Sequence, residues 1–281
     1  MATNEVNRND YEADAVNAAK SAMLELFHAL GEYREQIMLI GGWVPDLLFP
    51  NASPRHVGSM DIDLALDHRK FDEEGYRTVA QSLKQRGYVQ DSKQPFIYRK
   101  KITDKITVQL DLLAGEYGGT AKKRRTQKVQ DVQPRKVRGC DFAFESYVEV
   151  TLQGTLPNGA VDSTKIRIAS AVAIIVMKGI TMADRIKSKD AYDVYFCVKN
   201  FHGGIEALAG EFQPHLKHGL VKDGLTNLSD KFQTEKNYGP VSVADFENLP
   251  HGDERDEMIR DAFEQIRALL TILGYGAGGT K

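Results

Sequence analysis

The chain has 281 residues, of which 42% are hydrophobic and 27% charged, values close to those of ordinary globular proteins. It is long enough for one large or two modest domains with a real core, and neither intrinsic disorder nor a fibre fits this composition. Lysine and arginine number 37 against 39 aspartates and glutamates, so the net charge of −2 attracts neither nucleic acid nor membrane, and any basic binding site must be local.

Targeting and redox signals are weak throughout the sequence. The longest apolar run, residues 169–177, is shorter than the about 20 residues that a membrane-spanning helix needs, so we expect no membrane span. Residues 1–15 are polar and acidic, unlike a secretory signal, which predicts a cytoplasmic protein. Cys140 and Cys197 lie far apart without CxxC spacing, which indicates two ordinary thiols.

The first part of the chain mixes helical and strand patterns. Apolar residues at helical spacing predict an opening helix over residues 10–35. A short apolar run over residues 37–40 then meets two glycines, which indicates a strand, a tight turn and a brief helix. A strictly alternating strand follows, and then come a helical segment and two more strands, over residues 60–66, 72–87, 96–102 and 106–113.

The later part of the chain is mostly helical. Two strands are expected over residues 146–153 and 160–168. Helices are expected after them, over residues 169–183, 189–199, 204–212, 220–232 and 254–273. The sequence therefore predicts an α+β protein, with a small mixed sheet and flanking helices in residues 1–168 and a helical domain in residues 169–281 that completes a cleft.

One local run of basic residues interrupts this pattern, within a basic loop region over residues 118–139. Between residues 122 and 138 the only acidic residue is Asp131. A solvated loop is one interpretation, and a surface for RNA phosphates is the other. The RNA-binding interpretation concerns mainly the start of the run, Lys122, Lys123, Arg124 and Arg125. No aromatic residue lies within that cluster, so contacts to the RNA backbone are expected rather than base stacking.

Three aspartates suggest a metal site. Asp61 and Asp63 are two positions apart on a predicted strand, so both carboxylates lie on one face and repel each other. The side chain of Asp111 points to the polar face of the strand predicted over residues 106–113. If the two strands are neighbours, the three carboxylates converge, and oxygen ligands of this kind suit two Mg²⁺ ions in phosphoryl transfer. The alternatives without a metal are that Asp61 and Asp63 lie on a solvent-facing strand edge, and that Asp111 ends a strand and bonds to a turn.

A phosphate cradle would complete such a site. Gly41 and Gly42 precede a helix start, where backbone N–H groups can approach an anion. Ser59 lies two residues before Asp61 and adds a hydroxyl. The chain contains no GxxxxGK[ST], GxSxG or HExxH motif, so the P-loop ATPase, α/β-hydrolase and zincin classes lack their signatures.

These motifs resemble those of a known superfamily. Gly41-Gly42-Trp43 followed by Ser59-Met60-Asp61-Ile62-Asp63-Leu64 resembles the GG/GS…DxD signature of DNA polymerase β-like nucleotidyltransferases. Lys178, Arg185, Lys187 and the run Lys189-Asp190-Ala191-Tyr192-Asp193 resemble the K…R…KDxxD element of AbiEii-like nucleotidyltransferases, many of which are toxins of toxin–antitoxin and abortive-infection systems. The resemblance covers roughly residues 37–198.

The resemblance implies a Mg²⁺-dependent transfer of NMP from an NTP to an acceptor hydroxyl. The acceptor would be a tRNA 3′ end, and a cognate antitoxin protein would be expected. Metal ligands would be Asp61, Asp63 and Asp111; nucleotide-binding residues would be Gly41, Gly42, Ser59, Lys178 and Lys189; and Asp190 would act as a base or would orient the acceptor hydroxyl.

Lys178 and Asp193 have simpler interpretations as well. Lys178 interrupts an apolar helix and therefore needs either an anionic partner or a route to the surface. Asp193 shares a helix face with Asp190, and for Asp193 we favour a local salt bridge or the helix dipole.

Two other functions compete with an RNA-directed enzyme. The first glycine motif, together with Arg55-His56 and the aspartate pair, also resembles antibiotic nucleotidyltransferases of the aminoglycoside and lincosamide type. A small cationic drug would be repelled by the basic run. A non-catalytic nucleotide- or RNA-binding module is the second alternative, although a pure binding protein has no need of three clustered carboxylates.

Overall fold

The computed structural model describes residues 7–71, 77–117 and 125–276. Its contacts divide into two compact units. The sheet unit consists of Tyr11–Leu48 and Val57–Ser170, and the helical unit consists of residues 7–10, Phe49–His56 and residues 171–276. The predicted basic residues Lys122, Lys123 and Arg124 lie outside the described residues.

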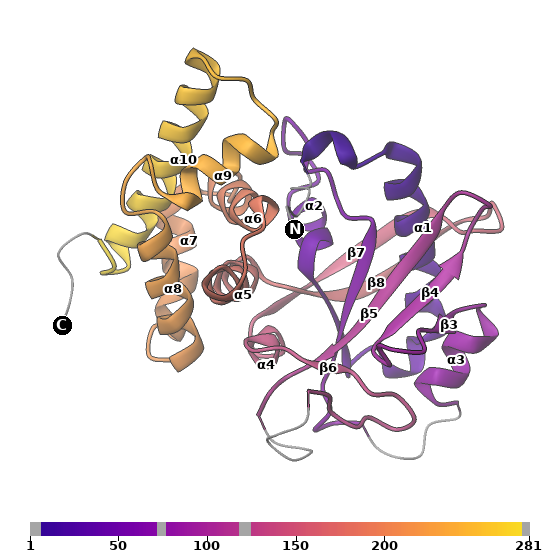
Figure 1. The fold of residues 1–281 in the computed structure, drawn as a ribbon. Coiled ribbons are helices and arrows are strands. Elements are labelled where there is room, and N and C mark those ends of the chain that lie inside the picture. The colour runs from indigo at the N-terminus through magenta and orange to yellow at the C-terminus, as the bar shows by residue number, and fades with distance from the viewer. Residues whose placement is uncertain (1–6, 72–76, 118–124, 277–281) are drawn as a thin grey trace. The chain divides into compact units, whose positions relative to one another are not determined.

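Within the described residues of the sheet unit, eight strands form one mixed sheet in the order β3-β4-β5-β2-β1-β8-β7, with β6 paired to β5 (Figure 1). The strands are β1 (Ile37–Ile40), β2 (Asp61–Leu66), β3 (Val89–Gln90), β4 (Ile97–Lys101), β5 (Thr107–Ala114), β6 (Arg135–Lys136), β7 (Tyr147–Thr155) and β8 (Val161–Ala169). The accompanying helices are α1 (Ala13–Ala29), α2 (Val44–Leu48), α3 (Val79–Gln85) and α4 (Cys140–Ala143).

One face of the sheet is covered by α1, which contacts β2, β5, β7 and β8. The alternation of β2 explains this packing, because Ile62 and Leu64 are fully buried whereas Asp61 and Asp63 are only half-buried. The apolar face of β2 thus belongs to the core. Its polar face carries the aspartates.

The helical unit contains α5 (Ala171–Asp184), α6 (Ser188–Lys199), α7 (Gly204–Phe212), α8 (Gly219–Lys231), α9 (Tyr238–Phe246) and α10 (Asp253–Ile272). Two glycines bring α5 and α8 together, because a Cβ on Gly179 would overlap with the carbonyl oxygen of Gly224. A Cβ on Gly224 would lie 2.8 Å from the carbonyl oxygen of Val176. The backbones therefore cross at a distance that only glycine permits.

The predicted α+β fold is confirmed, and the larger predicted elements are present with small shifts at their ends. Sequence reasoning missed β3, β6, α4 and α9. Helix α9 was not predicted because Gly239 and Pro240 are typical of turns. Pro240 lies in the first helical turn, where its missing N–H costs nothing. The predicted helix over residues 72–87 is shorter in the described residues, where α3 begins after Thr78.

Cys140 and Cys197 are free, in agreement with the two ordinary thiols predicted, and both are buried. None of the helices in the described residues combines the length and the apolar character that a bilayer crossing needs.

The glycine contact between α5 and α8 gives a stability prediction. Gly179→Ala should lower the free energy of unfolding by about 1 to 3 kcal/mol, because the added methyl group meets backbone that cannot rotate away. Gly210→Ala is the matched control, since it lies in α7 with nothing within 4 Å of its Cβ position, and it should stabilise by about 0.4 to 1 kcal/mol. Urea unfolding of both variants measures the difference. Equal effects would contradict the close crossing.

Candidate functional site

The pairing of β2 with β5 brings the three aspartates to one face of the sheet. The two strands are parallel neighbours, with Asp63 opposite Asp111 and Asp61 opposite Gln109. Directly paired residues of parallel strands point to the same side, and so do residues two apart on one strand. The condition set for the convergence of the three carboxylates, that the two strands are neighbours, is therefore met.

Hydrogen bonds hold two of these carboxylates in place. Ser59 Oγ donates to Asp61 Oδ1, and Gln109 Nε2 donates to Asp111 Oδ1 over 2.9 Å. The pKa of Asp111 lies above its usual value, because burial disfavours the charged carboxylate and the negative charge of Asp61 adds to the effect. Arg135 and Arg99 act in the opposite direction. Negative charge is thus concentrated on a half-buried surface.

The turn after β1 lies directly against Asp63. Gly41 has a φ of +76°, and a Cβ at this position would overlap with the Asp63 carboxylate. Any residue with a side chain would therefore be strained in its backbone and would collide with the aspartate. The Gly41-Gly42 turn and the aspartates form one continuous site within the sheet unit.

The donors fit a magnesium ion. Carboxylate and hydroxyl oxygens are the ligands that Mg²⁺ prefers, and the electrostatic strain between Asp61 and Asp111 is relieved by a cation. No group of three His, Cys, Asp or Glu side chains in the described part of the chain is gathered closely enough to hold a metal on its own. Mg²⁺ binds through one or two carboxylates together with substrate phosphates and water, so a closed protein cage is not required.

The second motif forms a buried ion cluster in the helical unit. Lys178 Nζ lies 2.6 Å from Asp190 Oδ1 and 2.7 Å from Asp193 Oδ2. Burial alone would lower the pKa of Lys178, but the two aspartates together hold it above its ordinary value. The anionic partner that Lys178 requires is therefore supplied by α6. The salt bridge favoured for Asp193 is also present.

Asp190 is fully buried and both of its oxygens have partners. Oδ1 faces Lys178, and the guanidinium of Arg185 donates to Oδ2 over 2.9 Å and to Oδ1 over 3.1 Å. Burial alone would raise the pKa of Asp190, but these cations hold it below its usual value. Such a carboxylate is a weak base, and this arrangement suits an orienting role better than proton abstraction.

His56 joins the same cluster, a position that the sequence did not predict for it. Its Nε2 lies 2.9 Å from Asp193 Oδ1, which Lys189 Nζ also contacts at 2.8 Å. The ring stacks on Tyr192 and meets the edge of Phe196. Burial lowers the pKa of His56 to about 4, with Lys189 contributing, so the ring is neutral at pH 7 and donates from Nε2 to Asp193. Periodicity gives no signal for a contact across 137 residues.

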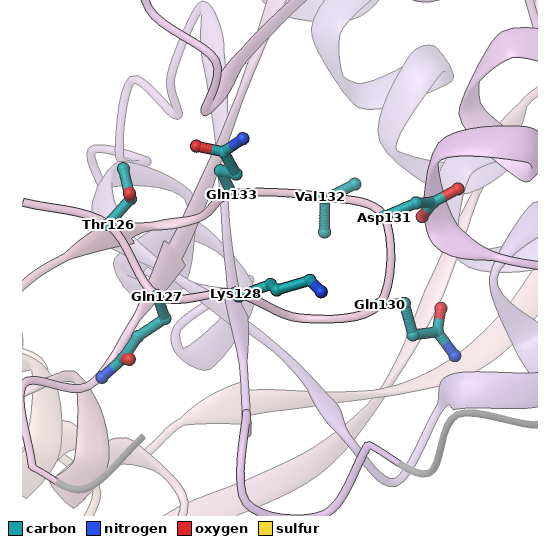
Figure 2. A pocket seen from close by; sticks show the side chains of 7 residues that line it. All are labelled: Thr126, Gln127, Lys128, Gln130, Asp131, Val132 and Gln133. Atoms are coloured by element: carbon teal, nitrogen blue, oxygen red, sulfur yellow. The ribbon is translucent and has the colours of Figure 1, made fainter. Parts of the chain in front are cut away.

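Arg125 is the only member of the predicted RNA-binding set within the described residues, and the loop after it is well folded. Asp131 Oδ1 accepts from the backbone N–H of Ala80, and Gln130 Oε1 accepts from that of Val79, so the loop caps α3. A cavity of about 190 Å³ lies along this loop. Figure 2 shows the lining residues Thr126, Gln127, Lys128, Gln130, Asp131, Val132 and Gln133. The cavity lining contains none of the three aspartates of the candidate metal site, Asp61, Asp63 and Asp111.

Comparison with known proteins identifies the family. The family model for the nucleotidyl transferase AbiEii toxin of a type IV TA system matches residues 26–271. The chain belongs to this family. It is therefore a nucleotidyltransferase toxin, which agrees with the enzyme predicted from the glycine and aspartate motifs.

Other comparisons add little to this AbiEii family assignment. No curated protein matches the chain. The crystal structure of JHP933 from Helicobacter pylori is similar at 14% sequence identity with a TM-score of 0.47, covering 93% of this chain and 94% of that chain. A TM-score of this size supports no conclusion about the AbiEii-family toxin described here.

The repulsion on the aspartate face gives a testable prediction for this AbiEii-family toxin. In EDTA, Asp111→Asn should raise the free energy of unfolding by about 0.2 to 1 kcal/mol, because it removes one of two neighbouring like charges and keeps an acceptor for Gln109. Added Mg²⁺ should raise the melting temperature of the wild type more than that of the variant. A destabilised variant in EDTA would contradict the repulsion.

The buried histidine makes stability depend on pH. The folded protein keeps His56 neutral down to about pH 4, whereas an unfolded histidine takes up a proton below about pH 6.5. The free energy of unfolding should therefore fall as the pH is lowered from about 6.5 to 4, by up to about 3 kcal/mol. Urea unfolding at several pH values measures this slope. His56→Gln keeps a donor for Asp193 and should lose this part of the slope, and equal slopes would refute the assignment.

Proposed function

We propose that this chain is a Mg²⁺-dependent enzyme that transfers an NMP from an NTP to the 3′-terminal hydroxyl of a tRNA. The observation that carries the proposal is the sheet register, which sets Asp61, Asp63 and Asp111 on one face beside the Gly41-Gly42 turn. Carboxylates for a cation and backbone donors for phosphates are the two parts that nucleotidyl transfer needs.

Each group of site residues in the sheet unit has a separate role in the reaction. The N–H groups that follow the Gly41 turn provide donors for the triphosphate, and Ser59 keeps Asp61 oriented through its hydroxyl. Asp61, Asp63 and Asp111 would supply carboxylate oxygens to a Mg²⁺ ion that also binds substrate phosphate and water, and the ion would neutralise phosphate charge and activate the attacking hydroxyl. Asp111 lies on the strand farther from the glycine turn, so its carboxylate is best placed for the acceptor hydroxyl. That hydroxyl attacks the α-phosphorus and expels pyrophosphate.

The role of the helical unit in this reaction rests on the resemblance of its motif. Lys178, Lys189 and Asp190 belong to the buried ion cluster described above. Nucleotide binding by the two lysines stays a prediction. The cluster also orders α5 and α6, so substitutions within it change stability as well as activity.

An RNA acceptor is favoured over a small cationic drug by the local charge of the sheet unit. Arg125, Lys128, Arg135, Lys136 and Arg138 follow one another in the described part of the basic loop, against a single acid, Asp131. This charge attracts a polyanion and repels an aminoglycoside. Membership in a type IV toxin–antitoxin family supports a cognate antitoxin as the protein partner, and cell growth with and without that antitoxin is its readout.

Radiolabel transfer tests the proposal. The purified protein is incubated with Mg²⁺, each α-³²P-labelled NTP in turn, and total RNA. Asp63→Ala should lower labelling of a tRNA-sized band by at least about 100-fold. Asp104→Ala removes an exposed carboxylate from the turn between β4 and β5 and should leave it unchanged. Aspartate-dependent label on an aminoglycoside instead of RNA would favour the antibiotic-type enzyme.

A further inference from the structure

Within the described residues, the guanidinium of Arg135 forms no hydrogen bond or ion pair, although its charge is near enough to act on Asp111. Its Nε atom is buried. The guanidinium carbon lies 5.4 Å from the centre of the Phe96 ring, so one face of the group is covered. The buried Nε donor is left without an acceptor, which costs free energy that an anion bound by the guanidinium would recover.

The sheet places Arg135 beside the aspartates. In the parallel pairing of β5 with β6, Arg135 lies opposite Leu113, which is two residues beyond Asp111 on the same side of the sheet. The positive charge of Arg135 also counteracts the rise in the pKa of Asp111. The guanidinium is therefore close enough to act on whatever Asp111 binds.

Arg135 lies on the other side of the aspartates from the glycine turn. The order β1-β2-β5 continues into β6, so three strand spacings, roughly 14 Å at about 4.8 Å each, separate β1 from β6. The triphosphate belongs to the β1 side, where Gly41 touches Asp63. The β6 side is left for the acceptor.

The basic residues around Arg135 favour a phosphodiester chain as its ligand. The backbone N–H of Lys136 donates to the carbonyl oxygen of Arg125 over 2.9 Å. The backbones of these two basic residues are therefore next to each other and close to Arg135. A guanidinium fork matches two oxygens of one phosphate, and neighbouring cations favour a chain of phosphates over a single anion.

We propose that Arg135 binds a backbone phosphate of the acceptor RNA and thereby places the terminal hydroxyl beside Asp111. This proposal rests on the proposed function, because it takes the acceptor to be RNA. It adds a specific acceptor-binding residue, on the side of the aspartates away from the nucleotide, which the glycine and aspartate motifs do not reveal.

Binding measurements without turnover test this role. The dissociation constant of a tRNA transcript is measured in EDTA by fluorescence anisotropy at several salt concentrations. The dissociation constant of an NTP is measured separately with Mg²⁺. Arg135→Gln should raise the tRNA value about tenfold and reduce the slope of log affinity against log salt by about one, while the NTP value stays the same. Arg135→Lys should recover part of the affinity, because it keeps the charge without the fork.

The matched control is Lys105→Gln, which removes one positive charge from the exposed turn between β4 and β5. It should change neither constant. Weaker NTP binding by Arg135→Gln with unchanged tRNA binding would place Arg135 on the nucleotide side and overturn the proposal. The proposal would also fail if Lys105→Gln lost as much tRNA affinity as Arg135→Gln, or if Arg135→Gln lost none. Because no transfer occurs, failure of the tRNA-transfer proposal appears separately, as absence of label in wild-type reactions.

Discussion

The carboxylate of Asp193 is the interaction on which the helical unit depends. It is fully buried, and it is contacted by two lysines, Lys178 from α5 and Lys189 from its own helix, and by His56. Burial alone would raise the pKa of Asp193, but these partners hold it well below its usual value, so the charge persists inside the fold. Removing one partner leaves an uncompensated buried charge, which costs about 3 to 5 kcal/mol. The motif that resembles an active-site element is therefore also a structural element.

The aspartate face follows a different physical rule. Its carboxylates are brought together by backbone register, and like charges remain neighbours with few internal cations to neutralise them. A protein retains such an arrangement at a cost in stability, and the cost is recovered when a cation or a ligand arrives. The ion cluster around Asp193 is internally compensated, whereas the site around Asp111 and Arg135 has complementary charges left for external partners.

The alternation of residues 60–66 was enough to predict a strand with Asp61 and Asp63 on its polar face, because a period of two is a local property. The pairing of Asp63 with Asp111 depends on which strands are neighbours, and was predicted only as a condition. The contacts of His56 with α6 and of Arg135 with the end of β5 were not predicted, because each joins residues far apart in the sequence. Lys178 shows the intermediate case. Its need for an anion was visible in its apolar helix, whereas the identity of that anion was not.

The division of the chain into units has a consequence for synthesis on the ribosome. Phe49–His56 belongs to the helical unit, although the residues on either side belong to the sheet unit. The partner of His56 lies 137 residues downstream, and at about 5 to 20 residues per second the ribosome needs roughly 7 to 30 seconds to synthesise the chain between them. During this time the contact between His56 and Asp193 is absent. The buried ion cluster of the nascent toxin is therefore completed only after most of its chain has emerged.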